Sequence, residues 1–318
     1  MNNALVLGGT GFVGRQVCEA LHRDGWRITV PTRRARNAQA IQHLPRVTVL
    51  QADVHNAQAL LGLVAGHDVV INLVAVLHGN AATFERNHVH LPERLAEACK
   101  QQGVRRLVHV SALGADAQGP SLYQRSKARG EAALQAAAAA GDLDLTVLRP
   151  SVIFGAGDRF LNTFAALQAV LPFVPLAGAQ TRFQPVWVND VAQALARCAH
   201  DPHTTGLTID AVGPDVCRLI DLVRLAGTLS GHPRPVFGVP EWAGRIQAAM
   251  MALMPGEPLM SQDNLRSMRV DNVRTGSGPD LKHLGIEPAS VHAVAPLYVG
   301  HQGPSSHLLQ CREKARRV

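Results

Sequence analysis

Three glycines near the start of the chain, Gly8, Gly11 and Gly14, constrain its fold more than any other feature. They follow a short apolar run, Ala4–Leu7, that predicts a strand, and they open a helical pattern over Phe12–Asp24. A glycine turn at this junction leaves free N–H groups at the helix start, where the helix dipole favours a phosphate. The spacing predicts a dinucleotide site rather than a glycine-rich turn without a ligand. The residues expected to contact the dinucleotide are Gly8, Thr10, Gly11, Phe12, Val13 and Gly14.

Short apolar strands alternate with helical patterns through the first half of the chain. The expected strands are 4–7, 27–31, 47–50, 68–76, 106–110 and 145–148, with helices ending near 65 and 102 and a helix over 123–140. Strands rich in β-branched residues and separated by helices are typical of βαβ units around a buried parallel sheet. The fold class is therefore α/β, a Rossmann-type doubly wound parallel sheet with helices on both faces.

After Pro150 this alternation loosens, because prolines interrupt the apolar runs. We expect a Rossmann domain over 1–150 and a smaller α/β domain over 151–300 that is interleaved with the last core elements. Its expected helices are 160–170, 189–200 and 216–230. The basic segment 301–318 is expected to be disordered.

A further helical pattern over Trp242–Met254 has one apolar face. That face consists of Trp242, Ile246, Met250, Leu253 and Met254. Core packing is the favoured interpretation, and a surface that faces lipid or quinone is the alternative.

Composition excludes several classes of protein. The five cysteines are scattered and unpaired in sequence, which argues against a disulfide framework or a zinc site, and the 15 histidines show no metal-ligand spacing. The net charge is +7, and nearly half of it comes from the last residues, so we expect no nucleic-acid partner. No apolar run is long enough to span a membrane, and no signal peptide is evident. We expect a cytoplasmic protein, with contact at the inner membrane as an alternative.

The second expected strand ends without an acidic residue. A carboxylate there normally binds the ribose of NAD, whereas this chain has Arg33 and Arg34. Guanidinium groups suit a 2′-phosphate, so NADP(H) is the preferred cofactor and NAD(H) the alternative, although both arginines could simply be solvated. Asp53, after the third strand, is placed to hold the adenine amino group or to cap the next helix.

Tyr123 and Lys127 are four residues apart, which places them on one face of a helix. A tyrosine must have its pKa lowered to transfer protons near neutral pH, and a nearby ammonium group does this. The pair predicts an acid/base site, and an exposed pair without function is the alternative.

These features together resemble the short-chain dehydrogenase/reductase superfamily of the extended type. The motifs are Gly8–Gly14, Asp53-Val54, Asn72–Ala75, Val110-Ser111, Tyr123/Lys127, Leu148–Pro150 and Val188–Ala192. More specifically, the sequence resembles the atypical group that includes alpha-subcomplex subunit nine of mitochondrial complex I and its bacterial relatives. The cues for that group are Val30–Arg34, Val110–Ala115, Pro150–Gly155, Leu253–Gly256, Asp271–Val273 and Leu284–Pro288.

The resemblance implies a bound nicotinamide dinucleotide and adds residues to its site. These are Val54, Leu73, Val74, Ala75, Pro150, Ser151 and Val152, the last three at the carboxamide edge. It also exposes two departures: the family's catalytic Ser/Thr position is Leu113, and its helix Asn position is His88, beside Asn87. Ser111 or Ser121 could replace the missing donor only along an altered backbone path.

Two functions follow from this sequence. The first is an NADP(H)-dependent oxidoreductase, or a related epimerase/dehydratase-like enzyme, that acts on an unidentified small molecule. In it Tyr123 is the acid/base, Lys127 lowers the tyrosine pKa and holds the ribose, and Ser111 assists. The alternative is a non-catalytic NADPH-binding accessory or sensing module that acts through a respiratory or membrane-associated partner.

Overall fold

The computed structural model describes residues 2–252 and 260–300, without the side chains of 247, 248 and 250–252. The described chain forms two compact units. The sheet unit comprises 2–151, 188–212 and 274–287, and the second unit comprises 152–187, 213–252, 260–273 and 288–300. The expected basic tail 301–318 and the motif Leu253–Gly256 lie outside the described residues.

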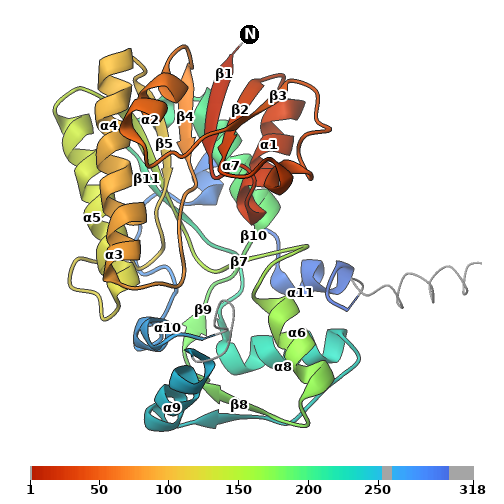
Figure 1. Ribbon diagram of the computed structural model, residues 1–318. Helices are drawn as coiled ribbons and strands as arrows, with labels where there is room; N and C mark the ends of the chain where they lie inside the picture. Colours follow the sequence, from red (N-terminus) through yellow and green to blue (C-terminus); the bar gives the residue numbers. More distant parts are fainter. Residues whose placement is uncertain (1, 253–259, 301–318) are drawn as a thin grey trace, which may run out of the picture. The chain divides into compact units, whose positions relative to one another are not determined.

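A seven-stranded, entirely parallel sheet forms the centre of the sheet unit, which confirms the predicted fold class (Figure 1). Its order is β11-β6-β5-β4-β1-β2-β3. The strands are β1 (Asn3–Leu7), β2 (Arg27–Thr32), β3 (Val47–Gln51), β4 (Val69–Asn72), β5 (Arg106–Val110), β6 (Asp144–Pro150) and β11 (Thr208–Ala211). The strand order reverses between β1 and β4, and open α/β sheets bind ligands outside the carboxyl ends of strands at such a point.

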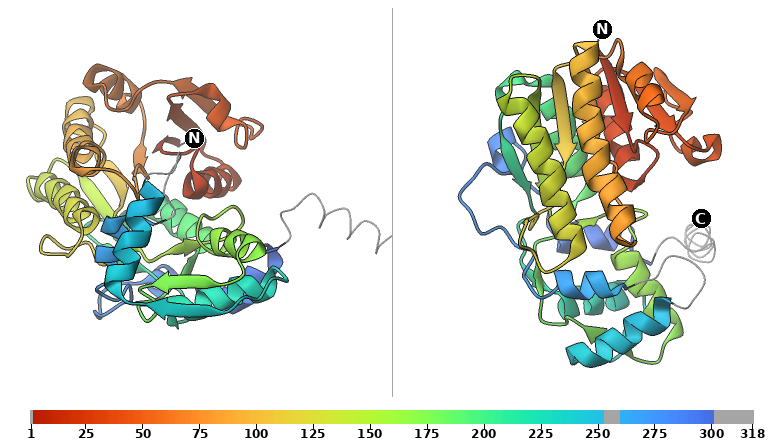
Figure 2. Two further views of the ribbon diagram at one scale, coloured as in Figure 1. Left: turned by 60° about the horizontal axis from the view of Figure 1, so that its bottom comes forward. Right: turned by 60° about the vertical axis from the view of Figure 1, so that its left-hand side comes forward.

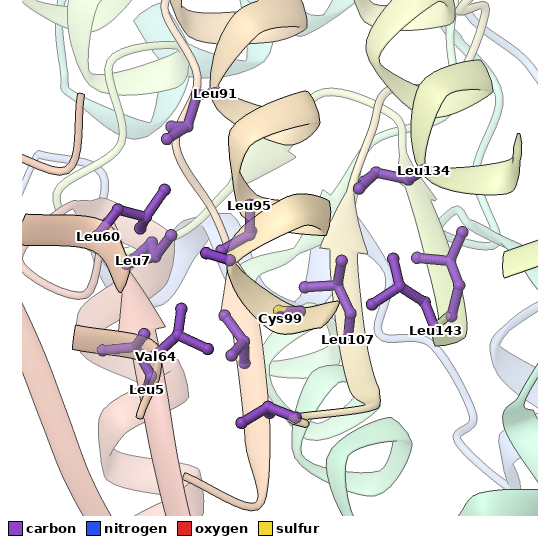
Figure 3. Packing of buried hydrophobic residues seen from close by; sticks show 14 of the residues in the cluster. Leu5, Leu7, Leu60, Val64, Leu91, Leu95, Cys99, Leu107, Leu134 and Leu143 are labelled. Carbon is purple, nitrogen blue, oxygen red and sulfur yellow. The ribbon is translucent and has the colours of Figure 1, made fainter. Parts of the chain in front are cut away.

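Helices cover both faces of this sheet (Figures 1 and 2). One face packs against α2 (Ala57–Val64), α4 (Leu91–Gln102) and α5 (Leu122–Ala139), and the other against α1 (Phe12–Arg23) and α7 (Val188–His200). Figure 3 shows the first of these cores, in which leucines of the strands meet those of the helices. Successive strand residues point to opposite faces of the sheet, so a strand that is covered on both faces is apolar throughout. The strands could therefore be predicted from their apolar runs in the sequence.

The strand expected over 68–76 is shorter than predicted, because β4 ends at Asn72. The Asn72 Oδ1 accepts the N–H of Val74 at 3.1 Å and turns the chain out of the sheet. The apolar residues that follow therefore form a loop at the carboxyl edge. The chain then continues through α3 (Ala81–Phe84) and a π-helical turn, η2 (Glu85–His90), into α4.

Short 3-10 turns complete the sheet unit. They are η1 (Ala35–Ala38), η3 (Pro202–Thr204) and η4 (Leu281–Leu284).

The second unit is built from short strands and helices around its own apolar clusters. Its strands pair as β10 (Val186–Trp187) with β7 (Ile153–Phe154), β12 (Cys217–Arg218) with β9 (Arg182–Phe183), and β13 (Val236–Val239) with β8 (Val174–Ala177). Its helices are α6 (Leu161–Val170), α8 (Leu219–Leu229), α9 (Glu241–Ala252), α10 (Gln262–Ser267), α11 (Val291–Val294) and the turn η5 (Ala295–Leu297). The Tyr298 hydroxyl donates to Asp158 Oδ2 at 2.7 Å and ties the end of this unit to its beginning.

Helix α9 does not bury the apolar face that the sequence led us to expect in a core. Trp242 is 67% exposed and Ile246 is 55% exposed, so core packing is wrong for both. Leu253 and Met254 lie outside the described residues, and the side chain of Met250 is not described. None of the helices in the described residues has the length and apolar character of a membrane-spanning segment.

Candidate functional site

The glycine loop lies where the strand order of the sheet reverses. Gly8 adopts φ +83°, a conformation that suits glycine, and a Cβ there would lie 3.2 Å from the backbone carbon of Leu73. The Leu73 N–H donates to the carbonyl of Leu7 at 2.9 Å. The glycine loop and the segment after β4, both predicted to contact the dinucleotide, are therefore neighbours.

The other two glycines of the loop differ in what surrounds them. A Cβ on Gly14 would lie 2.3 Å from the carbonyl oxygen of Gly8, so glycine is required for α1 to pack against the loop. A Cβ on Gly11 would meet only that same oxygen, at 3.2 Å, and Gly11 is exposed. Helix α1 has no side-chain cap and no acidic residue in its first turn. The first N–H groups of α1 therefore have no side-chain cap that would compete with the predicted phosphate.

The adenosine end of the predicted site lies beyond β2 and β3. Arg33 and Arg34 follow β2 and are exposed. Asp53 follows β3, and its Oδ1 accepts the N–H of His55 at 3.0 Å. The helix-cap interpretation of Asp53 is wrong, because Asn56 caps α2 by accepting the N–H of Ala59 at 2.9 Å. Asp53 is exposed, which leaves its carboxylate accessible to an adenine amino group.

Lys127 lies on α5 and is almost completely buried, at 2% exposure. Its Nζ donates to the carbonyl of Val110, at the end of β5, at 2.7 Å. Burial lowers the pKa of Lys127 to about 8, and the charge of Glu131 opposes that shift. Burying the ammonium group of Lys127 is unfavourable for folding. Lysines with pKa values shifted in this way are common at functional sites.

Tyr123 lies one turn before Lys127, with its ring edge-on to Phe84 and His88. Burial raises the pKa of Tyr123 to about 12. The direction is opposite to the lowering expected from Lys127, because burial disfavours the charged phenolate. The phenol of Tyr123 is therefore protonated at neutral pH.

The ring of His88 is fixed by a continuous hydrogen-bond chain. Its Nε2 accepts the N–H of Val76 at 3.1 Å, and its Nδ1 lies 2.9 Å from Ser126 Oγ, which donates to the carbonyl of Tyr123 at 2.9 Å. This pattern assigns the proton to Nδ1. Burial and the charge of Lys127 lower the pKa of His88 to about 3, so the ring is neutral and holds Tyr123 in place.

The position where extended family members carry a catalytic hydroxyl is apolar. Leu113 is 9% exposed, and its N–H donates to the carbonyl of Pro150 at 2.8 Å. Ser121 cannot replace it as a free donor, because its hydroxyl forms the capping box of α5 with Gln124. Ser111 is 3% exposed, and its Oγ has no hydrogen-bond partner in the described part of the chain.

Several ionisable residues around Lys127 were not predicted as part of the site. Glu131 is 2% exposed and receives two hydrogen bonds from Arg149, at 3.1 and 2.5 Å. His109 is neutral, because burial lowers its pKa, and its Nδ1 accepts from Asn72. Helical spacing of Glu131 from Lys127 was the only sequence signal available.

The carboxamide-edge residues lie at the end of β6. Pro150 ends the strand, and the Ser151 N–H donates to the carbonyl of Ala211 at 3.0 Å. Val152 begins the second unit. Across the described residues, no group of three or more His, Cys, Asp or Glu side chains is placed to hold a metal ion.

The doubly wound sheet, the glycine loop at its switch point and the uncapped α1 define a dinucleotide-binding protein. The chain belongs to the NAD dependent epimerase/dehydratase family, whose model matches residues 4–207. The resemblance to extended short-chain dehydrogenases/reductases is thereby confirmed, and membership of this family implies binding of a nicotinamide dinucleotide.

Two curated relatives and one solved structure illustrate these similarities. The chain is 33% identical over 297 residues to NADH dehydrogenase (ubiquinone) 1 alpha subcomplex subunit 9, mitochondrial, of Mus musculus, covering 90% of this chain and 76% of the relative. It is 29% identical over 237 residues to ceramide reductase of Caulobacter vibrioides, covering 74% and 73%. The structure of Pal from Bacillus thuringiensis, at 18% identity, has a TM-score of 0.74 over 94% of this chain and 98% of Pal, which supports the fold alone.

Proposed function

We propose that this chain binds NADP(H) and acts mainly as a cofactor-holding accessory or sensing protein. The observation that carries this proposal is the contrast at the carboxyl edge of the sheet. The glycine cradle and buried Lys127 are present, whereas the position for a carbonyl-polarising hydroxyl is occupied by buried Leu113. Without that donor, negative charge on a substrate oxygen is poorly stabilised.

We assign each part of the cofactor to a separate group of residues. The glycine loop receives the pyrophosphate, with Leu73, Val74 and Ala75 beside it. Arg33 and Arg34 receive the 2′-phosphate, which favours NADP(H) over NAD(H). Asp53 and Val54 hold the adenine, and Tyr123 and Lys127 hold the nicotinamide ribose. Pro150, Ser151 and Val152 hold the carboxamide.

The proposed partner is a respiratory or membrane-associated assembly. The similarity to a subunit of a mitochondrial NADH dehydrogenase supports this proposal. So do exposed apolar side chains of the second unit, among them Trp242 and Ile246 of α9 and the adjacent rings of Phe173 and Phe237. We place the protein in the cytoplasm, at the periphery of the inner membrane.

A second candidate is an NADP(H)-dependent oxidoreductase that acts on a small molecule. The unpartnered Ser111 hydroxyl favours it, because a buried hydroxyl without a partner is costly unless a ligand uses it. In this candidate Tyr123 donates the proton to the substrate oxygen, Lys127 holds the ribose, and Ser111 assists. Similarity to a ceramide reductase also supports this candidate.

One experiment separates the two functions. Purified wild type and Tyr123→Phe are tested for NADPH binding by cofactor fluorescence, and for NADPH oxidation with a broad carbonyl panel. The accessory function predicts binding by both proteins and no turnover above background. Brisk turnover by wild type that disappears in Tyr123→Phe would refute it in favour of the enzyme.

A further inference from the structure

Arg86 pairs with Asp53 across the sequence, and the end of β2 lies beside them, since the Ala52 N–H donates to the carbonyl of Thr32 at 3.0 Å. Asp53 and His55 follow β3, Arg86 and Asn87 lie in the π-helical turn η2, and Arg33 follows β2. The Arg86 Nη2 lies 3.5 Å from Asp53 Oδ2. The sequence identified Arg33 and Asp53 as cofactor contacts but not Arg86, because 33 residues separate Arg86 from Asp53.

The ion pair between Arg86 and Asp53 uses only one nitrogen of the Arg86 guanidinium group. The two side chains are 58% and 46% exposed, and an exposed pair with one long contact contributes little to stability. Arg129 and Glu85 form a contrasting pair, with two hydrogen bonds at 3.1 and 2.6 Å. Arg86 is therefore able to exchange its partner, whereas Arg129 is held by both carboxylate oxygens of Glu85.

The charges of Arg86 and Arg33 both affect the pKa of His55. Burial lowers the pKa of His55 most, and the charges of Arg86 and, more weakly, Arg33 lower it further. The charge of Asp53 and a hydrogen bond that the ring donates to the Asn87 side chain oppose this shift. Both guanidinium groups are thus close enough to influence the same imidazole.

We propose that Arg86 is a specificity-determining residue that binds the 2′-phosphate of NADP(H) together with Arg33. The proposal rests on the NADP(H) binding proposed above. When Asp53 receives the adenine amino group, Arg86 exchanges its weak contact with the carboxylate for the phosphate. A phosphate carries more negative charge than one carboxylate, and its oxygens accept two parallel guanidinium hydrogen bonds.

The test compares the nucleotide affinities of the full chain and four variants, one of which is Arg33→Ala. Arg86→Met removes the charge and keeps much of the side-chain length, Arg86→Lys keeps the charge, and Arg129→Met is the matched control. Dissociation constants are measured by calorimetry for NADPH, NADH, adenosine 2′,5′-bisphosphate and adenosine 5′-diphosphate. Melting temperatures establish that each variant is folded.

We expect Arg86→Met to weaken NADPH and the 2′,5′-bisphosphate about tenfold, with NADH and the 5′-diphosphate changed less than about twofold. Arg86→Lys should restore part of the loss, and Arg129→Met should leave all four constants unchanged. Equal losses for all four ligands would overturn the proposal in favour of an adenine contact. No loss in Arg86→Met, while Arg33→Ala abolishes the preference for NADPH, would overturn it and leave the proposed cofactor intact. A wild type that binds NADH as well as NADPH would overturn both.

Discussion

The buried ammonium group of Lys127 opposes folding near neutral pH. Its pKa is about 8 in the folded chain and about 10.5 in the unfolded chain, so between these values the unfolded state binds more protons. Stability from this residue therefore rises as pH increases from about 8 to 10.5, and below pH 8 the full cost of about 3 kcal/mol is present.

The first prediction is that Lys127→Met stabilises the chain while weakening its nucleotide affinity. Removing the charge eliminates the cost of burying it, although the carbonyl of Val110 loses its donor, so we expect a net gain of about 1–2 kcal/mol at pH 7. The gain should shrink as pH rises toward 10.5. Urea unfolding at several pH values measures it, and an NADPH titration should show at least about tenfold weaker binding. A destabilised variant that binds NADPH normally would contradict the assigned role.

The second prediction concerns Arg33, which is exposed and follows the strand whose end lacks an acid. Arg33→Ala should weaken NADPH by roughly 10- to 150-fold, since one charge-assisted contact contributes about 1.5–3 kcal/mol. NADH affinity should stay within about twofold, because NADH has no 2′-phosphate. Arg34→Ala is the comparison and should have the smaller effect. Equal losses for both nucleotides would show that Arg33 does not contact the phosphate.

At the scale of elements, the glycine loop offers two substitutions with different outcomes. Gly11→Val should fold, because its Cβ meets only one oxygen at 3.2 Å, yet the side chain should block the pyrophosphate. Gly14→Val should not fold normally, because its Cβ would lie 2.3 Å from a backbone oxygen. Melting curves and NADPH titrations distinguish the two. A folded Gly11→Val variant with wild-type NADPH affinity would show that the cofactor does not bind at this loop.

The segment after β5 provides a gain-of-function prediction. Leu113→Ser restores a hydroxyl at the family's donor position, at an expected cost of roughly 2–5 kcal/mol for truncating a buried leucine. If Leu113 is the reason for weak catalysis, this variant should reduce carbonyls faster than wild type. The gain should require Tyr123, so Leu113→Ser/Tyr123→Phe is the control. Leu113→Thr offers a larger side chain if the serine variant is unstable.

Strands and helices could be predicted from the sequence where their own residues determine the structure. The strands and helices around the sheet were found because their apolar periodicity reflects burial on two faces or on one. The end of β4 was missed, because the apolar residues after Asn72 continue the pattern while the Asn72 side chain redirects the backbone. Exposure of Trp242 was also missed, since an apolar helical face looks the same whether or not a partner covers it.

The candidate site was predictable only where its residues are close in sequence. The glycine loop and the pair Tyr123/Lys127 are local patterns, so their placement on one loop and one helix could be inferred. Arg86 beside Asp53 depends on tertiary packing between distant segments. The raised pKa of Tyr123 depends on burial by Phe84 and His88, which spacing alone does not reveal.

At the scale of the whole molecule, the sheet unit is assembled from three separate segments of the chain. The last strand, β11, pairs with β6 from Thr208 to Ala211, and α7 packs against β4, β5 and β6 as well as α1. In the third segment, Arg274 donates to Asp280 at 2.8 Å, and the Asp210 N–H donates to the carbonyl of Pro279 at 2.9 Å. The Rossmann domain expected over 1–150 therefore omits α7, β11 and residues 274–287, which belong to the same compact unit.

We therefore predict that the fragment 1–151 does not fold by itself. Without α7 the fragment loses the contacts that buried Val188, Val191 and Leu195 make with the sheet unit. Burial of each such side chain contributes roughly 1.5–3 kcal/mol, and the three together approach the free energy of unfolding of a whole domain. The fragment 1–212, which restores α7 and β11, is the control. Urea unfolding, dye binding to exposed apolar surface and NADPH titration of both fragments test this prediction. Cooperative unfolding and full NADPH affinity in 1–151 would contradict it, because the first segment would then form a complete nucleotide-binding domain.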